Sequence, residues 1–344
     1  MCIIFNAGGI LNKKPWLDEE GDFPIISTGH LPPAKQVQAM VDAAYEKYKI
    51  NNDGSNAQYY PALARVPSHF FGLCIVTSDG AVYSAGDTLV PFTIMSVSKP
   101  FVFGLLCQAI GPEEVRQSLG VNATGRPFNS IMAIELSPDR RTNPIVNSGA
   151  IAATSLVPGR TAEDKWQFIQ EGLSRFAGRE LRVNEEVYRS ASESNQRNQS
   201  IARLLESYGR LYFDPTSSVD LYTRQCSLDV SSYDLAVMAA TLADGGVNPI
   251  TKERVINAAI CPRVLATMAT AGMYETSGDW LYDIGLPGKS GVGGGIITVV
   301  PGKGGLGTFA PPLDDAGNSV RGQLATKYLS QNLGLNLFAS KPAF

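Results

Sequence analysis

The chain has 344 residues, of which 44% are hydrophobic and 18% are charged, a composition typical of globular proteins with one large domain or two interlocked ones. Its net charge of −3 and the lack of a long basic run argue against nucleic acid or a membrane surface as the main partner. No apolar stretch reaches the ~20 residues that a membrane-spanning helix needs. The five cysteines are scattered and form no C-x-x-C pair, so we expect reduced thiols and a cytoplasmic location.

The first third of the chain contains one predicted helix and two predicted strands. Residues 1–32 show no clear periodicity and are expected to form an irregular N-terminal arm. From Pro33 to Tyr48, apolar residues recur at helical spacing. Residues 70–76 and 81–85 predict two strands, and the Asp-Gly pair between them favours a hairpin.

Helices are expected through most of residues 101–270, and strands return near the end. The apolar spacing predicts three helices in this middle part, over residues 161–178, 184–208 and 232–245. The last part predicts a buried strand at 296–300, a turn at 302–307, a strand pairing back at 306–310 and a helix at 320–329.

This order of elements predicts an α/β protein of the α+β type. One antiparallel sheet, built from both ends of the chain and flanked by helices, would carry an all-helical insertion. We expect an arm at 1–32, a sheet-containing subdomain at 33–100 plus 272–344, and a mainly helical subdomain at 101–271. A site between the two subdomains would lie in a cleft.

A serine and a lysine three residues apart, Ser96 and Lys99, precede a long apolar run. Pro100 fits only the first turn of a helix, so a buried helix should begin here and place the two side chains one turn apart. Lysine can activate a serine nucleophile if burial and the helix dipole lower its pKa. The alternative is that Ser96 only caps the helix and Lys99 lies on the surface.

Other chemistries have weaker support. The only histidines are His30 and His69, which argues against a histidine-rich zinc site, and neither lies in a recognisable triad setting. The segment 288–290 lacks the first glycine of a phosphate-binding loop, and 302–307 is followed by prolines that would block the required helix. No cofactor or metal is therefore expected.

A second motif, Lys289-Ser290-Gly291, stands before the buried strand at 296–300. An upstream S-x-x-K followed by such a motif is the layout of serine–lysine acyl-transfer enzymes. The backbone N–H groups of Val292 and Ser96 would then form an oxyanion hole, in which one donor is worth ~3 kcal/mol. The alternative is that these glycines only allow close packing.

The chain resembles the serine-dependent glutaminase family, whose fold is related to β-lactamases, from about residue 34 to its end. The stretches that carry the resemblance run in the family's order and lie at residues 96–100, 143–151, 272–274, 285–295 and 312–319. The resemblance implies hydrolysis of L-glutamine to L-glutamate and ammonia through a serine acyl-enzyme. We expect a small-molecule amide as substrate and a homodimer or homotetramer as the assembly.

The resemblance also implies roles for single residues. Ser96 is the expected nucleophile, Lys99 its activator, and Tyr222 and Tyr274 assist proton transfer. The positions that match the family's substrate contacts are Tyr59, Asn147, Asn198 and Val292. On the residues alone, these tyrosines would be interpreted as core residues and Asn147 as a turn residue.

Two positions depart from the family pattern. Ala191 replaces a glutamate that contacts the substrate's α-amino group, and Met95 replaces a glutamine before the nucleophile. Losing a carboxylate that pairs with an ammonium weakens binding, and Glu193 would lie on a different helix face. The alternatives are therefore an amidohydrolase acting on a carboxamide without a free α-amino group, a hydrolase of β-lactams, and a non-catalytic relative.

Overall fold

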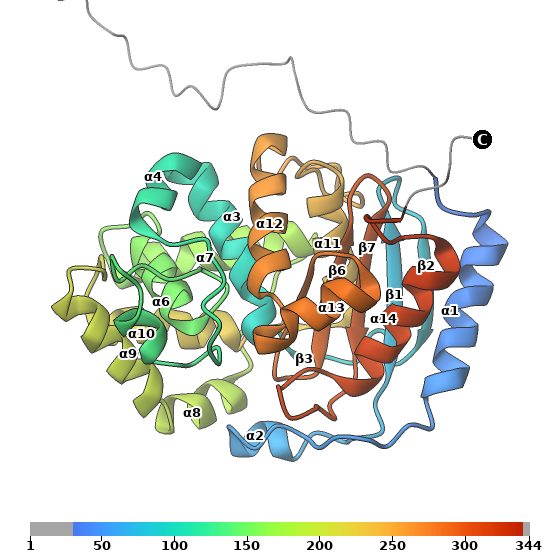
Figure 1. Ribbon diagram of the computed structural model, residues 1–344, viewed down its shortest axis with the longest axis horizontal. Coiled ribbons are helices and arrows are strands. Elements are labelled where there is room, and N and C mark those ends of the chain that lie inside the picture. Colours follow the sequence, from blue (N-terminus) through green and yellow to red (C-terminus); the bar gives the residue numbers. More distant parts are fainter. Residues whose placement is uncertain (1–29, 340–344) are drawn as a thin grey trace, which may run out of the picture.

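The computed structural model describes residues 30–339, in which a sheet with its covering helices lies beside a group of helices (Figure 1). Most of the predicted N-terminal arm, residues 1–32, lies outside the described residues. No helix between residues 30 and 339 combines the length and apolar character needed to cross a membrane.

The main sheet has five strands in the order β2-β1-β7-β6-β5, and all of its pairings are antiparallel. The strands are β1 (Gly72–Thr77), β2 (Val82–Gly86), β5 (Gly288–Ser290), β6 (Gly295–Val300) and β7 (Gly304–Phe309). A separate short ladder joins β3 (Phe92–Thr93) to β4 (Asp229–Val230). Because β1 pairs with β7, with Ile75 opposite Leu306, the prediction of one antiparallel sheet built from both ends of the chain is confirmed.

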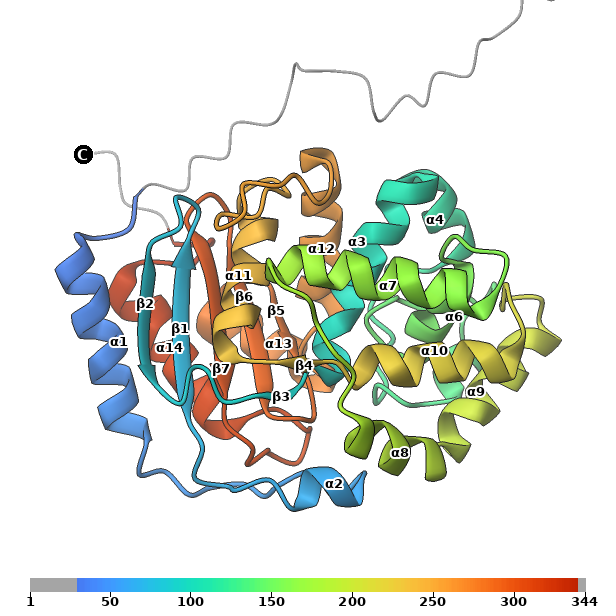
Figure 2. The same ribbon diagram turned by 180° about the vertical axis from the view of Figure 1, so that it is seen from behind.

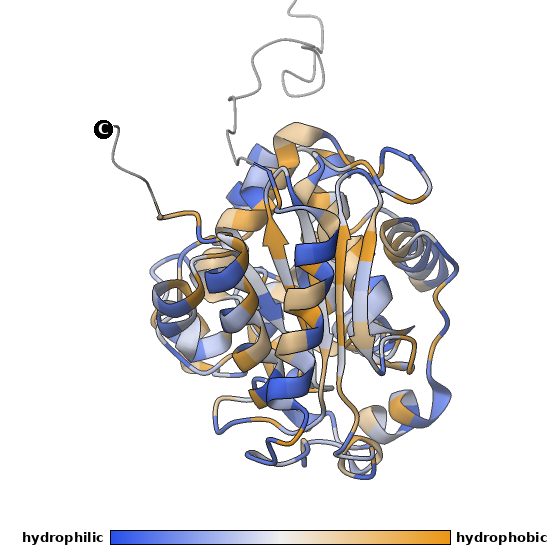
Figure 3. Ribbon diagram, turned by 90° about the vertical axis from the view of Figure 1, so that its right-hand side faces the viewer, coloured by the Kyte–Doolittle hydropathy of each residue, from blue (hydrophilic) through white to orange (hydrophobic). Residues whose placement is uncertain are grey.

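Side chains alternate between the two faces of this sheet, as the period of a strand requires. Leu73 and Ile75 of β1 join a core with α1 (Ala34–Tyr48), α13 (Ser277–Ile284) and α14 (Val320–Leu333). Cys74 and Val76 face α11 (Ser232–Ala243) on the other side. Figures 1 and 2 show these two helical layers from opposite sides, and Figure 3 shows the hydrophobic strands behind α1.

Strand β7 begins earlier than the sequence predicted. The interpretation of residues 302–307 as a turn is wrong for its second half, because β7 starts at Gly304. A Cβ on Gly305 would lie 2.3 Å from the backbone nitrogen of Ala240, and one on Gly307 would lie 2.1 Å from the carbonyl oxygen of Ser232. The glycines therefore allow α11 to pack directly on the strand backbone.

The helices follow the predicted pattern with one break. Helix α7 (Ala162–Ala177) starts at a Thr161–Asp164 capping box and ends at Gly178 in the left-handed conformation, as predicted. The single helix predicted over 184–208 is wrong, because α8 (Glu185–Glu193) and α9 (Gln196–Ser207) are separate. The backbone leaves helical geometry at Ser194 and Asn195, residue types whose side chains compete for backbone hydrogen bonds.

Seven further helices belong to the described part of the chain. They are α2 (Pro61–Ala64), α3 (Lys99–Ile110), α4 (Pro112–Ser118), α5 (Met132–Glu135), α6 (Asn147–Leu156), α10 (Pro215–Cys226) and α12 (Cys261–Ala271). Residues 30–339 also contain three short 3₁₀ turns, which are η1 (Met95–Ser98), η2 (Ala258–Ile260) and η3 (Tyr274–Thr276). Strand β5 forms the sheet edge that contacts η1.

Candidate active site

Ser96 lies in the 3₁₀ turn η1, which runs directly into α3 at Lys99. The backbone N–H of Lys99 donates to the carbonyl oxygen of Ser96, and Pro100 occupies the first turn of α3. Ser96 is 7% exposed and Lys99 only 2%, so the alternative of a surface lysine is wrong. The sequence thus correctly predicted a buried helix that begins within a few residues of Ser96.

The backbone on either side of this turn is strained. Met95 has a φ of +48° and Tyr274 a φ of +56°, both in the left-handed region that side chains with a Cβ rarely adopt. Such a conformation costs about 1–3 kcal/mol and is found preferentially where function requires a fixed geometry. Met95 directly precedes Ser96 in the chain, and the Tyr274 hydroxyl donates to the carbonyl oxygen of Ser290, in the segment that lies against the same turn.

The Lys99 amine is held by a single polar side chain in an otherwise closed environment. Its Nζ donates to Oδ1 of Asn147 at 2.7 Å and lies 6.0 Å from the centre of the Phe128 ring. Burial lowers the pKa of Lys99 to about 8, and the nearby Cys226 opposes this shift. Lys99 is therefore poised to exchange a proton near neutral pH.

Two further predicted site residues, Tyr222 and Asn198, bond to the same amide of Asn147. The Tyr222 hydroxyl donates to Oδ1 of Asn147 at 3.2 Å, and Nδ2 of Asn147 donates to Oδ1 of Asn198 at 3.1 Å. Burial raises the pKa of Tyr222 well above its ordinary value, and Cys226 adds to the rise. Tyr222 is therefore a poor base, and in this arrangement it is a hydrogen-bond donor.

The Lys289-Ser290-Gly291 segment lies against the turn that carries Ser96. A Cβ on Gly291 would lie 3.0 Å from the carbonyl oxygen of Ile94, so only a glycine allows this approach without displacement. The Tyr274 hydroxyl donates to the carbonyl oxygen of Ser290 at 3.1 Å, and Nζ of Lys289 lies 4.3 Å from the centre of the Tyr274 ring. Burial raises the pKa of Tyr274, and hydrogen bonding with Ser96 opposes the rise.

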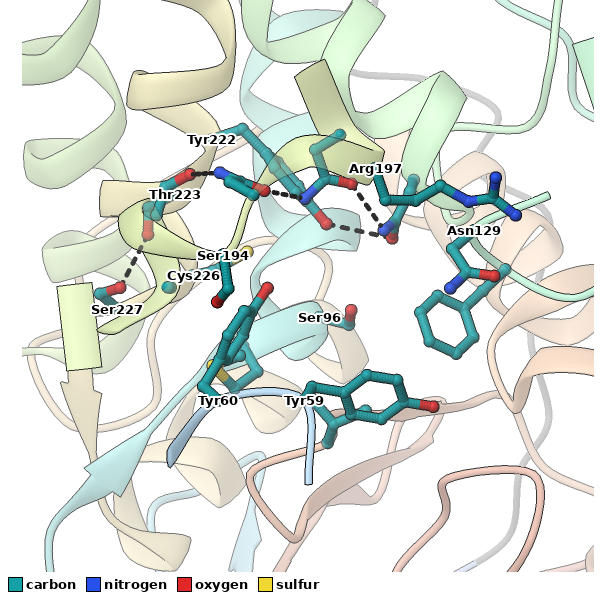
Figure 4. Close-up of a pocket in the computed structure, with 17 residues that line it drawn as sticks. Tyr59, Tyr60, Ser96, Asn129, Ser194, Arg197, Tyr222, Thr223, Cys226 and Ser227 are labelled. Atoms are coloured by element: carbon teal, nitrogen blue, oxygen red, sulfur yellow. Dashed lines mark hydrogen bonds between the residues drawn. The ribbon is translucent and has the colours of Figure 1, made fainter. Parts of the chain in front are cut away.

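A pocket opens above Ser96, with Tyr59 and Tyr60 on one side and Tyr222 on the other (Figure 4). Its volume of about 120 Å³ is below the ~300–1,000 Å³ typical of drug-sized ligands, so it suits a small molecule. The predicted residues that line it are Tyr59, Ser96, Asn147, Asn198, Tyr222 and Val292. Lys99 and Tyr274 lie behind this lining, where they contact Asn147 and Ser290.

The pocket also contains residues that the sequence did not single out. They are Tyr60, Phe128, Asn129, Ser194, Asn195, Arg197, Thr223, Cys226 and Ser227. Most come from the α8–α9 break and from the face of α10 that carries Tyr222, two features that helical periodicity does not reveal. Met95 and Ala191, the two positions expected to depart from the family pattern, line the pocket as well, whereas Glu193 is exposed and outside it.

Comparison with known proteins identifies the family. Residues 54–338 match the sequence profile described as Glutaminase. The chain belongs to the glutaminase family. It is 62% identical to glutaminase 2 of Yersinia pestis over 322 residues, covering 94% of this chain and 95% of that protein. The predicted family and the predicted amidohydrolase class are therefore confirmed.

Solved glutaminase structures share the fold. A probable glutaminase superposes with a TM-score of 0.88 at 46% identity, covering 90% of this chain and all of the other. A probable glutaminase from Bacillus subtilis, complexed with 6-diazo-5-oxo-L-norleucine, gives a TM-score of 0.79 at 32% identity, covering 89% and 97%. The predicted fold, a sheet flanked by helices as in glutaminases, is confirmed by these similarities.

Proposed function

We propose that this protein hydrolyses L-glutamine to L-glutamate and ammonia through an acyl-enzyme on Ser96. The observation that carries the proposal is the buried pair of Ser96 and Lys99 at the start of α3, in which burial lowers the pKa of Lys99 to about 8. A serine hydroxyl needs a neighbouring base to become a nucleophile, and this pair supplies both parts.

Lys99 is the proposed base. The two candidate tyrosines are unsuitable because burial raises the pKa values of Tyr222 and Tyr274 above their ordinary value, which disfavours phenolate. With a pKa of about 8, roughly a tenth of Lys99 is neutral at pH 7, enough to accept the proton of Ser96.

In the first step, Ser96 Oγ attacks the side-chain carboxamide carbon and Lys99 accepts the hydroxyl proton. The carbonyl oxygen becomes an oxyanion, for which the N–H groups of Ser96 and Val292 are the proposed donors. When the C–N bond breaks, its electron pair stays with nitrogen, which takes a proton from Lys99 and leaves as ammonia. Tyr274, whose pKa the nearby Ser96 lowers against the effect of burial, is the residue proposed to assist this proton transfer.

In the second step, water attacks the acyl carbon and gives a proton to Lys99. The ester bond to Ser96 breaks, Ser96 recovers a proton, and glutamate is released. On binding, the proposed contacts are the amides of Asn147 and Asn198 and the half-exposed ring of Tyr59 at the pocket mouth. The diazoketone bound by the Bacillus subtilis relative has the carbon skeleton of glutamine extended at the reacting end, which supports glutamine as substrate.

One observation favours a second candidate substrate. Among residues 30–339, no Asp or Glu lines the pocket, and Ala191 lines it at the position where the resemblance to the family implies a glutamate. An α-ammonium would therefore lack a carboxylate partner inside the pocket. The same chemistry on an amide without a free α-amino group, such as an N-acylglutamine, is the alternative.

The test is ammonia release from L-glutamine and from N-acetyl-L-glutamine, with Ser96→Ala as the control. Release from glutamine that disappears in the control is expected, together with attachment of 6-diazo-5-oxo-L-norleucine to Ser96, located by peptide mass spectrometry. Release from the acetylated amide alone would support the alternative substrate. Activity retained by Ser96→Ala would contradict the mechanism.

A further inference from the structure

A chain of buried hydrogen bonds links the proposed base to the backbone of α10, and Figure 4 shows its middle part, between Tyr222 and Thr223. Lys99 Nζ and the Tyr222 hydroxyl donate to Asn147, Asn147 donates to Asn198, and Asn198 donates to Asn195 at 2.7 Å. Asn195 in turn donates to Thr223 Oγ1 at 2.7 Å, and Thr223 donates to the carbonyl oxygen of Val219 at 2.7 Å. The four linking side chains, Asn147, Asn195, Asn198 and Thr223, are each at most 7% exposed.

The last hydrogen bond of this series, from Thr223 to Val219, determines which atom donates and which accepts in all the others. A backbone carbonyl only accepts, so the single hydroxyl proton of Thr223 is committed to Val219. Thr223 Oγ1 must then accept from Asn195, which fixes the amide of Asn195 with its oxygen toward Asn198. Because Asn195 Oδ1 accepts from Asn198 Nδ2, Asn198 presents its Oδ1 to Nδ2 of Asn147. The Oδ1 atom of Asn147 is then left facing Lys99.

This direction decides what Lys99 offers to Ser96. A neutral lysine has two N–H donors and one lone pair, and here one N–H is committed to Asn147. The lone pair stays free to accept the proton of Ser96. If the Asn147 amide were reversed, its NH₂ group would face Lys99 and occupy that lone pair.

We propose that Asn195 and Thr223 are positioning residues that hold the Asn147 amide in the orientation that leaves the Lys99 lone pair free. The inference rests on the proposed function, because it concerns the base of that reaction. Neither residue belongs to the predicted site. Asn195 is available only because the helix breaks between α8 and α9, so the break itself serves the arrangement.

The first test compares Thr223→Val with Thr223→Ser. Valine has nearly the shape of threonine but removes the acceptor of Asn195, whereas serine keeps it. We expect kcat for glutamine to fall about 10-fold or more in Thr223→Val, part of the 10²–10⁴-fold that a positioned proton-transfer group contributes, with a smaller change in KM. Thr223→Ser should stay close to the parent protein.

Thr326→Val is the matched control for losing a buried hydroxyl. Thr326 Oγ1 also donates to a carbonyl one turn earlier, that of Gly322 at 2.8 Å, but it lies on α14 outside the site. Its kcat should equal that of the parent. Asn195→Ala is the second variant. It interrupts the same series of hydrogen bonds at a different residue and should reproduce the effect of Thr223→Val.

The second readout is the pKa of Lys99 by carbon-13 NMR of labelled lysine in the full chain, with Lys99→Met for assignment. A reversed amide presents N–H groups to the amine and disfavours its charged form, so the pKa should fall in Thr223→Val and Asn195→Ala. The titratable groups around Lys99 that remain in place are Tyr222 and Cys226 on α10, Tyr274 in η3 and Lys289 on β5. General loosening would admit water and move the pKa up, toward 10.5.

The outcomes separate this proposal from the proposed function. An unchanged Lys99 pKa in both variants, or a rise that Thr223→Ser shares, would overturn the positioning role whatever the substrate is. A lowered pKa in a protein that does not release ammonia from glutamine would support the positioning role and contradict the glutaminase mechanism. A lowered pKa with reduced kcat would support both.

Discussion

On the sheet side of the site, the groups next to the turn that carries Ser96 are backbone atoms. On the helical side, they are amide and hydroxyl side chains. On the sheet side, Gly291 and Gly293 press against the backbone of residues 93–94, and the proposed donor Val292 stands between them. On the helical side, Asn147, Asn195 and Asn198 are oriented by one another and by Thr223. Geometry on the first side therefore depends on the absence of side chains, and on the second side it depends on a set of polar partners.

The largest expected effect comes from Lys99, which lies where the two sides meet. Lys99→Met keeps the length of the side chain but removes the proton acceptor, so kcat should fall about 10²–10⁴-fold. In the parent protein, activity should rise with pH through about 8, as Lys99 loses its proton. A kcat–pH profile of both proteins checks this, and a rising limb retained by Lys99→Met would assign the base to another group.

The same substitution should stabilise the protein. The folded-state pKa of Lys99 lies below its ordinary 10.5, so the unfolded chain binds more protons between pH 8 and 10.5. Protonation of Lys99 thus costs about 3 kcal/mol of stability below pH 8, and the cost disappears as the pH rises to 10.5. Lys99→Met should unfold at higher denaturant concentration at pH 7, with a gain that shrinks above pH 8.

The second effect concerns the sheet side. A Cβ on Gly293 would lie 2.7 Å from the carbonyl oxygen of Thr93, so Gly293→Ala must displace the backbone that carries Val292. If Val292 is an oxyanion donor, kcat should fall about 10²-fold, the effect of losing one such donor, with little change in KM. Steady-state kinetics at saturating glutamine measure this.

Gly278→Ala is the matched control for this substitution. Gly278 lies in α13, and a Cβ there meets nothing within 4 Å. The change should leave kcat unaltered and raise the stability by about 0.5–1 kcal/mol, because alanine favours a helix over glycine. A similar kcat in both glycine variants would mean that Val292 makes no contribution to catalysis.

The sequence predicted the sheet side better than the helical side. Strand and turn patterns predicted the sheet and its pairing. The S-x-x-K spacing, together with Pro100, predicted the start of a buried helix at Ser96. The α8–α9 break was missed because apolar residues such as Val187 and Ile201 keep an acceptable helical spacing across Ser194 and Asn195. The roles of Gly305 and Gly307 were missed because they depend on α11, which lies about 70 residues away in the chain.

The other features that the sequence did not predict depend on polar partners that are distant in the chain. Asn195 and Thr223 are 28 positions apart, and nothing in either local sequence indicates that they form a hydrogen bond. The positive φ angles of Met95 and Tyr274 are likewise imposed by the surrounding fold and not by residue type. Local pattern therefore located the nucleophile and its base, while the fold determines how they are oriented.

The smallest expected effect concerns Ala191, which tests how the polar partners of the helical side select the substrate. Ala191 is 3% exposed and lines the pocket, so Ala191→Glu places a carboxylate where a substrate ammonium can reach it. A charge-assisted hydrogen bond is worth ~1.5–3 kcal/mol, and the lower end of this range lowers KM for glutamine about 10-fold with little change in kcat. The unliganded variant should unfold at a lower temperature, because the new carboxylate is buried without a partner.

Two comparisons make the Ala191→Glu result specific. An amide of the same length without the α-amino group, 5-amino-5-oxopentanoate, should gain nothing, because the new carboxylate then lacks its partner. Glu193→Gln changes an exposed carboxylate outside the pocket and should leave KM unaltered. If KM for glutamine does not fall, the carboxylate at position 191 does not pair with the substrate ammonium. Glu275, whose charge adds to the burial that raises the pKa of Tyr59, is then the acid to substitute.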